Sequence, residues 1–163
     1  DFCLSRGLGD VYKRQLKILI YDCGGEIDTV DFNTRADLVD LQKENEKYIK
    51  IALNLFRKGI QNGSIDEIGR ASSISAFANQ KILYKKQLNR FYKVGMQVGG
   101  KGIICAHSGT VLGLIVSADG DIENMKQSIN EYMGKDFSYL DSVEIINQGI
   151  IDRKCDANEF DKE

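Results

Sequence analysis

The stretch Gly99–Val116, with the sequence GGKGIICAHSGTVLGLIV, is the part of the chain from which its fold is best predicted. It joins a glycine cluster to two short apolar runs, residues 102–106 and 111–116, which are typical of buried strands. The polar turn His107–Thr110 separates the two runs. A turn between buried strands can present main-chain N–H donors to an anion. The alternative is an ordinary hairpin that binds nothing.

Three familiar motifs are nearly formed in this region, and each fails. The segment Gly95–Lys101 approaches a phosphate loop, but Gly102 replaces the hydroxyl that binds Mg²⁺, and the segment runs from a helix to a strand. The same reversed order excludes the dinucleotide-binding fingerprint at Gly100–Cys105. Residues Ala106–Thr110 lack the outer glycines of the G-x-S-x-G motif, which makes a hydrolase triad a poor explanation.

Composition limits the class of protein. The 163 residues are 28% charged and 42% hydrophobic, as expected for one globular domain. A net charge of −2 without a basic cluster makes nucleic acid and anionic membranes poor partners. No apolar run approaches the roughly 20 residues needed to cross a bilayer.

The cysteines predict no metal site. Cys3, Cys23, Cys105 and Cys155 are scattered, and a single histidine cannot complete a ligand set with them. Two of the four adjoin predicted strands, where cysteine usually acts as a small hydrophobic residue. We therefore expect no bound metal in this chain and a reducing, cytoplasmic location.

The two ends of the chain differ from its middle. Residues Ser5–Gln15, SRGLGDVYKRQ, match the translation of a transposon-type sequencing adapter, so we leave residues 1–15 out of the fold prediction. We expect the natural sequence to begin near Leu16, within a longer protein. Residues 16–150 form the predicted domain. The acidic segment 151–163 lacks an apolar period and is expected to be a frayed tail.

The order of predicted elements favours an α+β fold with a mainly antiparallel sheet and helices packed on one face. Strands are predicted where apolar runs are short, and helices where apolar residues recur every three or four positions. The elements in order are a strand at Leu16–Cys23, a helix that starts near Thr34 and Asp37 and ends near Gly59, a helix from Ser64 through Ala78, a helix over 83–97 with Tyr84 on its apolar stripe, strands at 102–106 and 111–116, a helix at Asp121–Met133 and a strand at Val143–Asn147.

Two polar sites outside the central stretch are candidates for ligand contact. Asp28 follows a predicted strand and the flexible pair Gly24-Gly25, a common position for a functional carboxylate, although a solvated turn explains it as well. Asn79-Gln80 closes a predicted helix made largely of small residues, where a helix cap is the simpler interpretation.

Taken together, three segments resemble the C-terminal lobe of the GHMP kinases, the superfamily of galactokinase, homoserine kinase and mevalonate kinase. They are Gly24–Thr29 (GGEIDT) after a strand, Asn79–Leu83 (NQKIL) at a helix end, and Gly99–Leu114 with its Ala-His-Ser-Gly-Thr turn. The L-threonine kinase branch, which serves cobalamin synthesis, is the most similar. This resemblance implies a ferredoxin-like lobe, over roughly residues 16–150.

The resemblance also implies roles for particular residues. The turn is expected to face the phosphates of ATP, and Asp28, Thr29, Asn79 and Gln80 are expected near the acceptor substrate. ATP and Mg²⁺ are the expected cofactors, and an amino acid with a hydroxyl group is the expected acceptor. The phosphate-facing residues are His107, Ser108, Gly109 and Thr110.

One departure from the family pattern is large. The principal ATP-binding loop of the family, Pro-x-x-x-Gly-Leu-x-Ser-Ser, is absent, and the chain contains no proline. The main catalytic groups of such a kinase are therefore expected upstream, and this chain alone is expected to be inactive. Other GHMP kinases acting on homoserine or isoprenoid precursors, and a non-catalytic ferredoxin-like ligand-binding module, remain alternatives.

Overall fold

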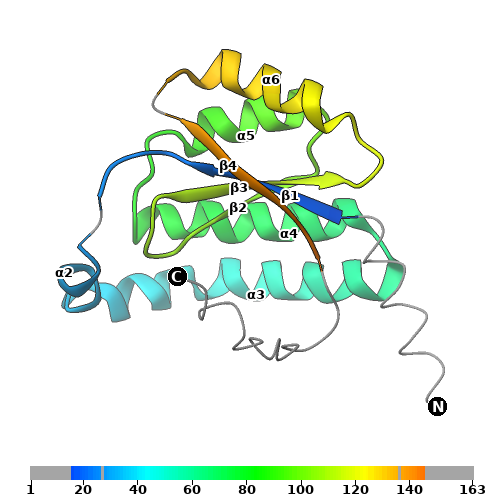
Figure 1. Cartoon of the computed structure of the whole chain (residues 1–163). Coiled ribbons are helices and arrows are strands. Elements are labelled where there is room, and N and C mark those ends of the chain that lie inside the picture. The colour runs from blue at the N-terminus through cyan, green and yellow to red at the C-terminus, as the bar shows by residue number, and fades with distance from the viewer. Residues whose placement is uncertain (1–15, 27, 136, 146–163) are drawn as a thin grey trace, which may run out of the picture.

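The computed structural model describes residues 16–26, 28–135 and 137–145, which form both strands and helices (Figure 1). The elements in chain order are β1 (Leu16–Asp22), α2 (Thr29–Asn33), α3 (Leu38–Asn62), α4 (Ile65–Ala78), the 3₁₀ turn η1 (Asn79–Lys81), α5 (Leu88–Gln97), β2 (Gly102–Cys105), β3 (Val111–Ser117), α6 (Ile122–Met133) and β4 (Ser138–Glu144). Residues 1–15, 146–150 and the tail 151–163 lie outside the described residues, so the predictions made for them stay predictions.

The four strands form one antiparallel sheet in the order β2-β3-β1-β4. Alternation along each strand divides the side chains between two faces. In the central pair Leu19 lies opposite Leu114 and Tyr21 opposite Leu112, and all four side chains are fully buried. The sheet therefore has one strongly apolar face, as the short apolar runs predicted.

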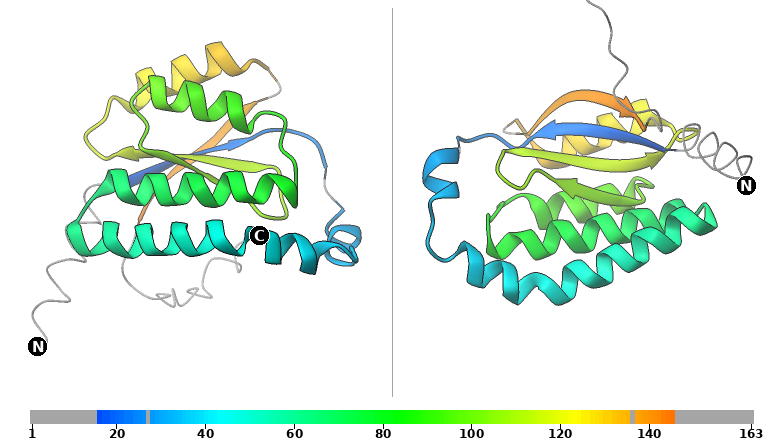
Figure 2. Two further views of the ribbon diagram at one scale, coloured as in Figure 1. Left: turned by 180° about the vertical axis from the view of Figure 1, so that it is seen from behind. Right: turned by 90° about the horizontal axis from the view of Figure 1, so that it is seen from below.

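Helices α5 and α6 cover that apolar face (Figures 1 and 2). Phe91 of α5 and Ile129 of α6 are completely buried in the same cluster as the strand side chains. Tyr21 stacks on Phe137 with ring centroids 5.0 Å apart and meets Phe91 edge to face at 5.5 Å. Burying aromatic side chains of this size contributes roughly 1.5–3 kcal/mol each.

Helix α4 lies along β2, the edge strand of the sheet, and α3 packs on the outer side of α4 (Figure 2). The contact between α4 and β2 is unusually close. A Cβ atom placed on Gly69 would lie only 2.0 Å from the carbonyl oxygen of Lys101, and one on Gly102 would lie 2.0 Å from the carbonyl oxygen of Gly69. Small residues in α4 thus serve packing against a strand.

Helix α3 ends later than the sequence predicted. It continues through Gly59, which is buried against α4. The approach is close enough that a Cβ at Gly59 would lie 2.9 Å from Ile68 Cγ1, so glycine is needed there for packing. The helix stops at Asn62, and Gly63 takes the left-handed conformation with φ of 65° that commonly ends a helix. The capping box that starts α4 forms as predicted, with the Ser64 hydroxyl accepting the Glu67 N–H at 3.2 Å.

The start of α3 was also placed wrongly. The short helix α2 precedes it, and the Thr34 hydroxyl donates to the Val30 carbonyl of α2 instead of capping α3. Asp37 occupies the N-cap position of α3 but makes no capping bond, because its carboxylate pairs with Arg35.

Two further predicted boundaries are wrong. The helix predicted over 83–97 starts at Leu88, and Tyr84, assigned to its apolar stripe, is 71% exposed. The last strand is β4 at Ser138–Glu144, which begins five residues before the predicted Val143. Its side chains are nearly all exposed, so it lacks the apolar pattern by which a strand is found.

The predicted fold class is confirmed as an α+β fold with an antiparallel sheet. No helix among the described residues has both the length and the apolar character needed to span a bilayer.

The close approach of α4 to β2 gives a first test. Gly69→Ala is expected to lower the free energy of unfolding by about 3 kcal/mol, because the added methyl group would overlap the β2 backbone. Ser72→Ala, three residues along α4 and only half-buried, is the control and should change stability little. Urea unfolding of both variants measures the difference, and equal midpoints would contradict the proposed contact.

Candidate functional site

The turn between β2 and β3 is the centre of the candidate site. The Ala106 N–H donates to the Val111 carbonyl at 2.9 Å and closes the turn. His107 and Ser108 are exposed at its tip, whereas Gly109 and Thr110 are half-buried. The backbone of the turn is therefore fixed at its base while its polar tip is open to a ligand.

Thr110 anchors one side of the turn to the end of β1. Its carbonyl accepts the Cys23 N–H at 3.1 Å and the Cys23 thiol at 2.6 Å. Its hydroxyl donates to the carboxylate of Asp22, which lowers the pKa of that carboxyl, and the Gly24 N–H lowers it further. The side chain of Thr110 is thus already engaged within the protein.

Lys85 anchors the other side of the turn. Its side chain is buried, and its ammonium group donates to the Gly109 carbonyl. The backbone of Lys85 is held in turn by Gln80, whose Oε1 accepts the Lys85 N–H at 2.7 Å and whose Nε2 donates to the Lys85 carbonyl at 3.0 Å. Both polar atoms of the Gln80 amide therefore have a partner within the protein.

Beside the turn between β2 and β3, two cavities lie between α3 and α4. One has a volume of about 300 Å³ and is lined by His107 of the turn and Asn79 of η1. The walls of this cavity are Phe32, Asn33, Leu38, Gln42, Asn45, Ile49, Ser75 and Ile82. A second, more apolar cavity of about 350 Å³ adjoins it and shares Ile49, Ser75 and His107. Two of the predicted site residues are thus brought together at one cavity.

Two buried amides lie at the cavity of about 300 Å³. Asn45 of α3 donates through Nδ2 to the Ala78 carbonyl at 2.7 Å, which satisfies a backbone group at the end of α4. Its Oδ1 is buried and has no hydrogen-bond partner within the described residues. Asn79 is also buried, and its Nδ2 lies 3.7 Å from Cys105 Sγ.

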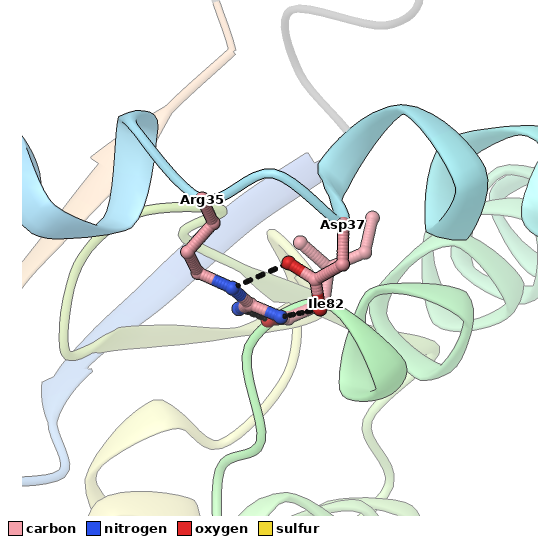
Figure 3. A network of polar contacts seen from close by, with 3 residues as sticks. All are labelled: Arg35, Asp37 and Ile82. Carbon is pink, nitrogen blue, oxygen red and sulfur yellow. Dashed lines mark hydrogen bonds and ion pairs between the residues drawn. The ribbon is translucent and has the colours of Figure 1, made fainter.

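Arg35 forms a network of polar contacts with Asp37 and with Ile82, a residue that lines the cavity (Figure 3). Its guanidinium group forms a two-pronged pair with Asp37, with Nε at 3.0 Å from Oδ1 and Nη2 at 2.7 Å from Oδ2. Nη1 donates to the Ile82 carbonyl at 2.6 Å. This fork ties the connection between α2 and α3 to the segment after η1, and it lowers the pKa of Asp37.

Two further predicted site residues, Asp28 and Thr29, lie at the start of α2. Asp28 accepts the Val30 N–H at 2.9 Å, begins α2 and lines neither cavity. Thr29 is the first residue of α2, and its side chain lies outside the described part of the structure. The predicted roles of Asp28 and Thr29 stay predictions.

Four residues that shape the site are not singled out by the sequence. Lys85 lies in a predicted helix, and nothing in its local pattern indicates that its side chain is buried. Asn45 and Gln42 belong to an amphipathic helix, on which amides normally face solvent. Arg35 has no predicted role, and its partner Asp37 is predicted, with Thr34, to start a helix.

Comparison with solved structures identifies the fold. The L. major mevalonate kinase in complex with R-mevalonate matches 82% of this chain and 44% of its own length, with a TM-score of 0.61 at 11% identity. The Methanococcus jannaschii mevalonate kinase matches 82% and 41% with a TM-score of 0.54 at 16% identity. A homoserine kinase from Cytophaga hutchinsonii matches 83% and 43%, again with 0.54 at 16%.

These matches confirm the predicted fold. The chain shares its fold with part of these mevalonate and homoserine kinases. The chain spans less than half the length of each of these solved kinases. No protein-family model and no curated protein matches the sequence.

The bond between Thr110 and Asp22 gives a second test. Thr110→Val removes the hydroxyl donor, so the pKa of Asp22 should rise toward its ordinary value of about 3.9. A lowered pKa in the folded state stabilises the protein above the unfolded pKa, and this contribution is lost as the pH falls through the folded value. The stability difference between the parent and Thr110→Val due to this bond should therefore vanish in acid.

NMR titration of the carboxyl groups measures this effect. Asp37, whose pKa is lowered by Arg35, is the internal control and should titrate identically in both proteins. An unchanged Asp22 titration in Thr110→Val would show that the hydroxyl does not hold the carboxylate.

Proposed function

We propose that this chain is the C-terminal lobe of a GHMP-type kinase that phosphorylates the hydroxyl group of L-threonine for cobalamin synthesis. The observation that carries the proposal is the placement of His107 and Asn79 on one cavity, beside a turn held between β2 and β3. The fold shared with mevalonate and homoserine kinases supports the reaction class.

The turn suits the demands of phosphoryl transfer. This reaction depends almost entirely on positioning and on stabilising charge around the transferred group. In our proposal Ser108, Gly109 and Thr110 position phosphate oxygens, and His107 orients the group that is transferred. Because the Thr110 hydroxyl is engaged by Asp22, we assign its role to the backbone of the turn.

The cavity beside the turn favours an acceptor without net charge. Among the side chains that the structure describes, its walls include the amides of Gln42, Asn45 and Asn79 and no Asp, Glu, Lys or Arg. A lone carboxylate placed there would lack a counter-charge, and burying an unpaired charge is costly. A zwitterionic amino acid brings both charges together, and amides can bond to its ammonium and carboxylate groups. L-threonine and L-homoserine meet this requirement better than mevalonate.

Asn79 is the central acceptor-binding residue in this proposal. It is buried at the cavity, whereas Asp28 and Thr29 enter the proposal only through their position at the start of α2. Gln80 acts through Lys85, because both ends of its amide are bonded to that residue's backbone.

The proposed cofactors are ATP and Mg²⁺ in the intact enzyme. The turn, with Lys85 behind it, suits a phosphate group. Among the described residues there is no group of three His, Cys, Asp or Glu side chains placed to hold a metal. We therefore assign the Mg²⁺ ligands and the main catalytic groups to the part of the enzyme that lies outside this chain.

An acceptor assay tests the proposed function directly. The full-length protein encoded by the gene that contains this chain should turn over ATP with L-threonine and more slowly with L-homoserine. Turnover with mevalonate alone would reject the threonine assignment, and no turnover with any of the three would favour a non-catalytic binding module. Formation of ADP, coupled to a spectrophotometric readout, is a suitable measurement.

The role of Asn79 can be tested in the same enzyme. Asn79→Ser shortens the amide side chain and is expected to raise the KM for the amino acid about tenfold, the effect of losing one or two hydrogen bonds. The KM for ATP should change far less. Asn54→Ser, on the exposed side of α3, is the matched control and should leave both constants unchanged. An equal rise in both KM values would indicate general disruption of the lobe.

A further inference from the structure

Lys85 is a buried cation, and among the side chains that the structure describes none forms an ion pair with it. Its side chain is about as inaccessible as the apolar core, with 5% of the residue exposed. Its ammonium group donates to the neutral carbonyl of Gly109. An ammonium group buried in this way is costly unless an anion compensates it.

The groups around this ammonium do not supply the missing charge. The thiols of Cys23 and Cys105 lie near Lys85, and burial raises the pKa of both thiols, which keeps them neutral near pH 7. The carboxylate of Asp22, at the end of β1, is already bonded to the Thr110 hydroxyl and the Gly24 N–H. The uncompensated charge thus lies directly behind the polar turn.

The position of the ammonium group is fixed by the fold. Gln80 clamps the Lys85 backbone from both sides, and Asn79, the residue before Gln80, contacts Cys105 at the start of the turn. Gln87, two residues after Lys85, donates to the Cys23 carbonyl at 3.4 Å. The lysine is therefore held near η1, the end of β1 and the turn, with its ammonium group directed at the Gly109 carbonyl.

We propose that Lys85 is the positioning residue of the turn and the counter-charge for a phosphate group bound at its tip. The proposal rests on the proposed kinase function, which supplies the phosphate-bearing ligand. Lys85 acts through Gly109, whose carbonyl it holds, and its charge acts on the bound anion at short range through a poorly solvated region. Phosphate binding compensates a charge that folding alone leaves unpaired.

The proposal makes an unusual pair of predictions for Lys85→Met, which keeps the length of the side chain and removes its charge. In chloride buffer the variant should be at least as stable as the parent, because an uncompensated buried charge has been removed. Its response to inorganic phosphate should be lost. A purely structural lysine would give the opposite result, a loss of stability with an unchanged phosphate response.

Urea unfolding of the 163-residue chain, in sodium chloride and in sodium phosphate of equal ionic strength, measures both effects. Phosphate should raise the midpoint of the parent, since a ligand of the folded state stabilises it. Lys86→Met, the adjacent exposed lysine, changes the net charge equally and should respond as the parent does. The apparent phosphate affinity of Lys85→Met should fall on the order of tenfold or more, and Lys85→Arg should retain most of it.

Each other outcome overturns the proposal. A parent that does not respond to phosphate, equal responses of Lys85→Met and Lys86→Met, or a Lys85→Met variant that is destabilised or unfolded in chloride would reject the assigned role. The proposed function is tested separately by turnover of the full-length enzyme. If Lys85→Met turns over substrate with an unchanged KM for ATP, the proposed role of Lys85 is rejected and the proposed kinase function stands. If phosphate binding depends on Lys85 but the full-length protein shows no turnover, the kinase function is rejected and the role of Lys85 in binding phosphate stands.

Discussion

The backbone contact between α4 and β2 is the constraint on which the rest of the structure depends. β2 is the edge of the sheet, and the unpaired N–H groups of an edge strand need partners. The Ile103 N–H donates to Ser73 Oγ at 3.0 Å, and that hydroxyl donates to the Gly69 carbonyl at 2.9 Å. Glycine at 69 and 102 allows the helix to come near enough for this exchange. One side of the sheet is thereby closed by a helix instead of a fifth strand.

The site follows from this contact. Because α4 is fixed along β2, its C-terminal end lies beside the turn that follows β2, and η1 places Asn79 at the cavity that His107 also lines. Asn45 then joins α3 to the last carbonyl of α4, so both walls of the cavity are set by the same helix. Arg35 pairs with Asp37 and donates to the Ile82 carbonyl, which ties the segment before α3 to the segment after η1 (Figure 3). Residues from distant parts of the sequence are thus held together by bonds between their elements.

The sequence predicts the regular parts of this fold better than its connections. The strands at 16–22, 102–105 and 111–117 carry short apolar runs, and the Ser64 capping box marks the start of α4, so local chemistry is sufficient there. Gly59 was misplaced because a glycine that ends a helix and one that admits a neighbouring helix look alike in sequence. Segment 82–87 has helical periodicity, but its conformation depends on the local bonds between Gln80 and Lys85 and on the distant bond from Lys85 to Gly109. The burial of Lys85 likewise depends on three segments that only the fold assembles.

The division of charge across the site is consistent with a two-substrate reaction. The turn has a buried cation behind it, and the described side chains of the adjoining cavity include amides but no Asp, Glu, Lys or Arg. An anion is therefore favoured at the turn, while the cavity favours a ligand whose own charges cancel. If both charges of an amino acid were matched by charged side chains, a phosphate group beside them would compete for the same cation. An amide-lined cavity avoids that competition, because amides bond to either charge without attracting the neighbouring phosphate. In the proposed kinase, this arrangement would keep the hydroxyl acceptor and the phosphate donor in separate, adjacent places, which is the geometry that transfer between them requires.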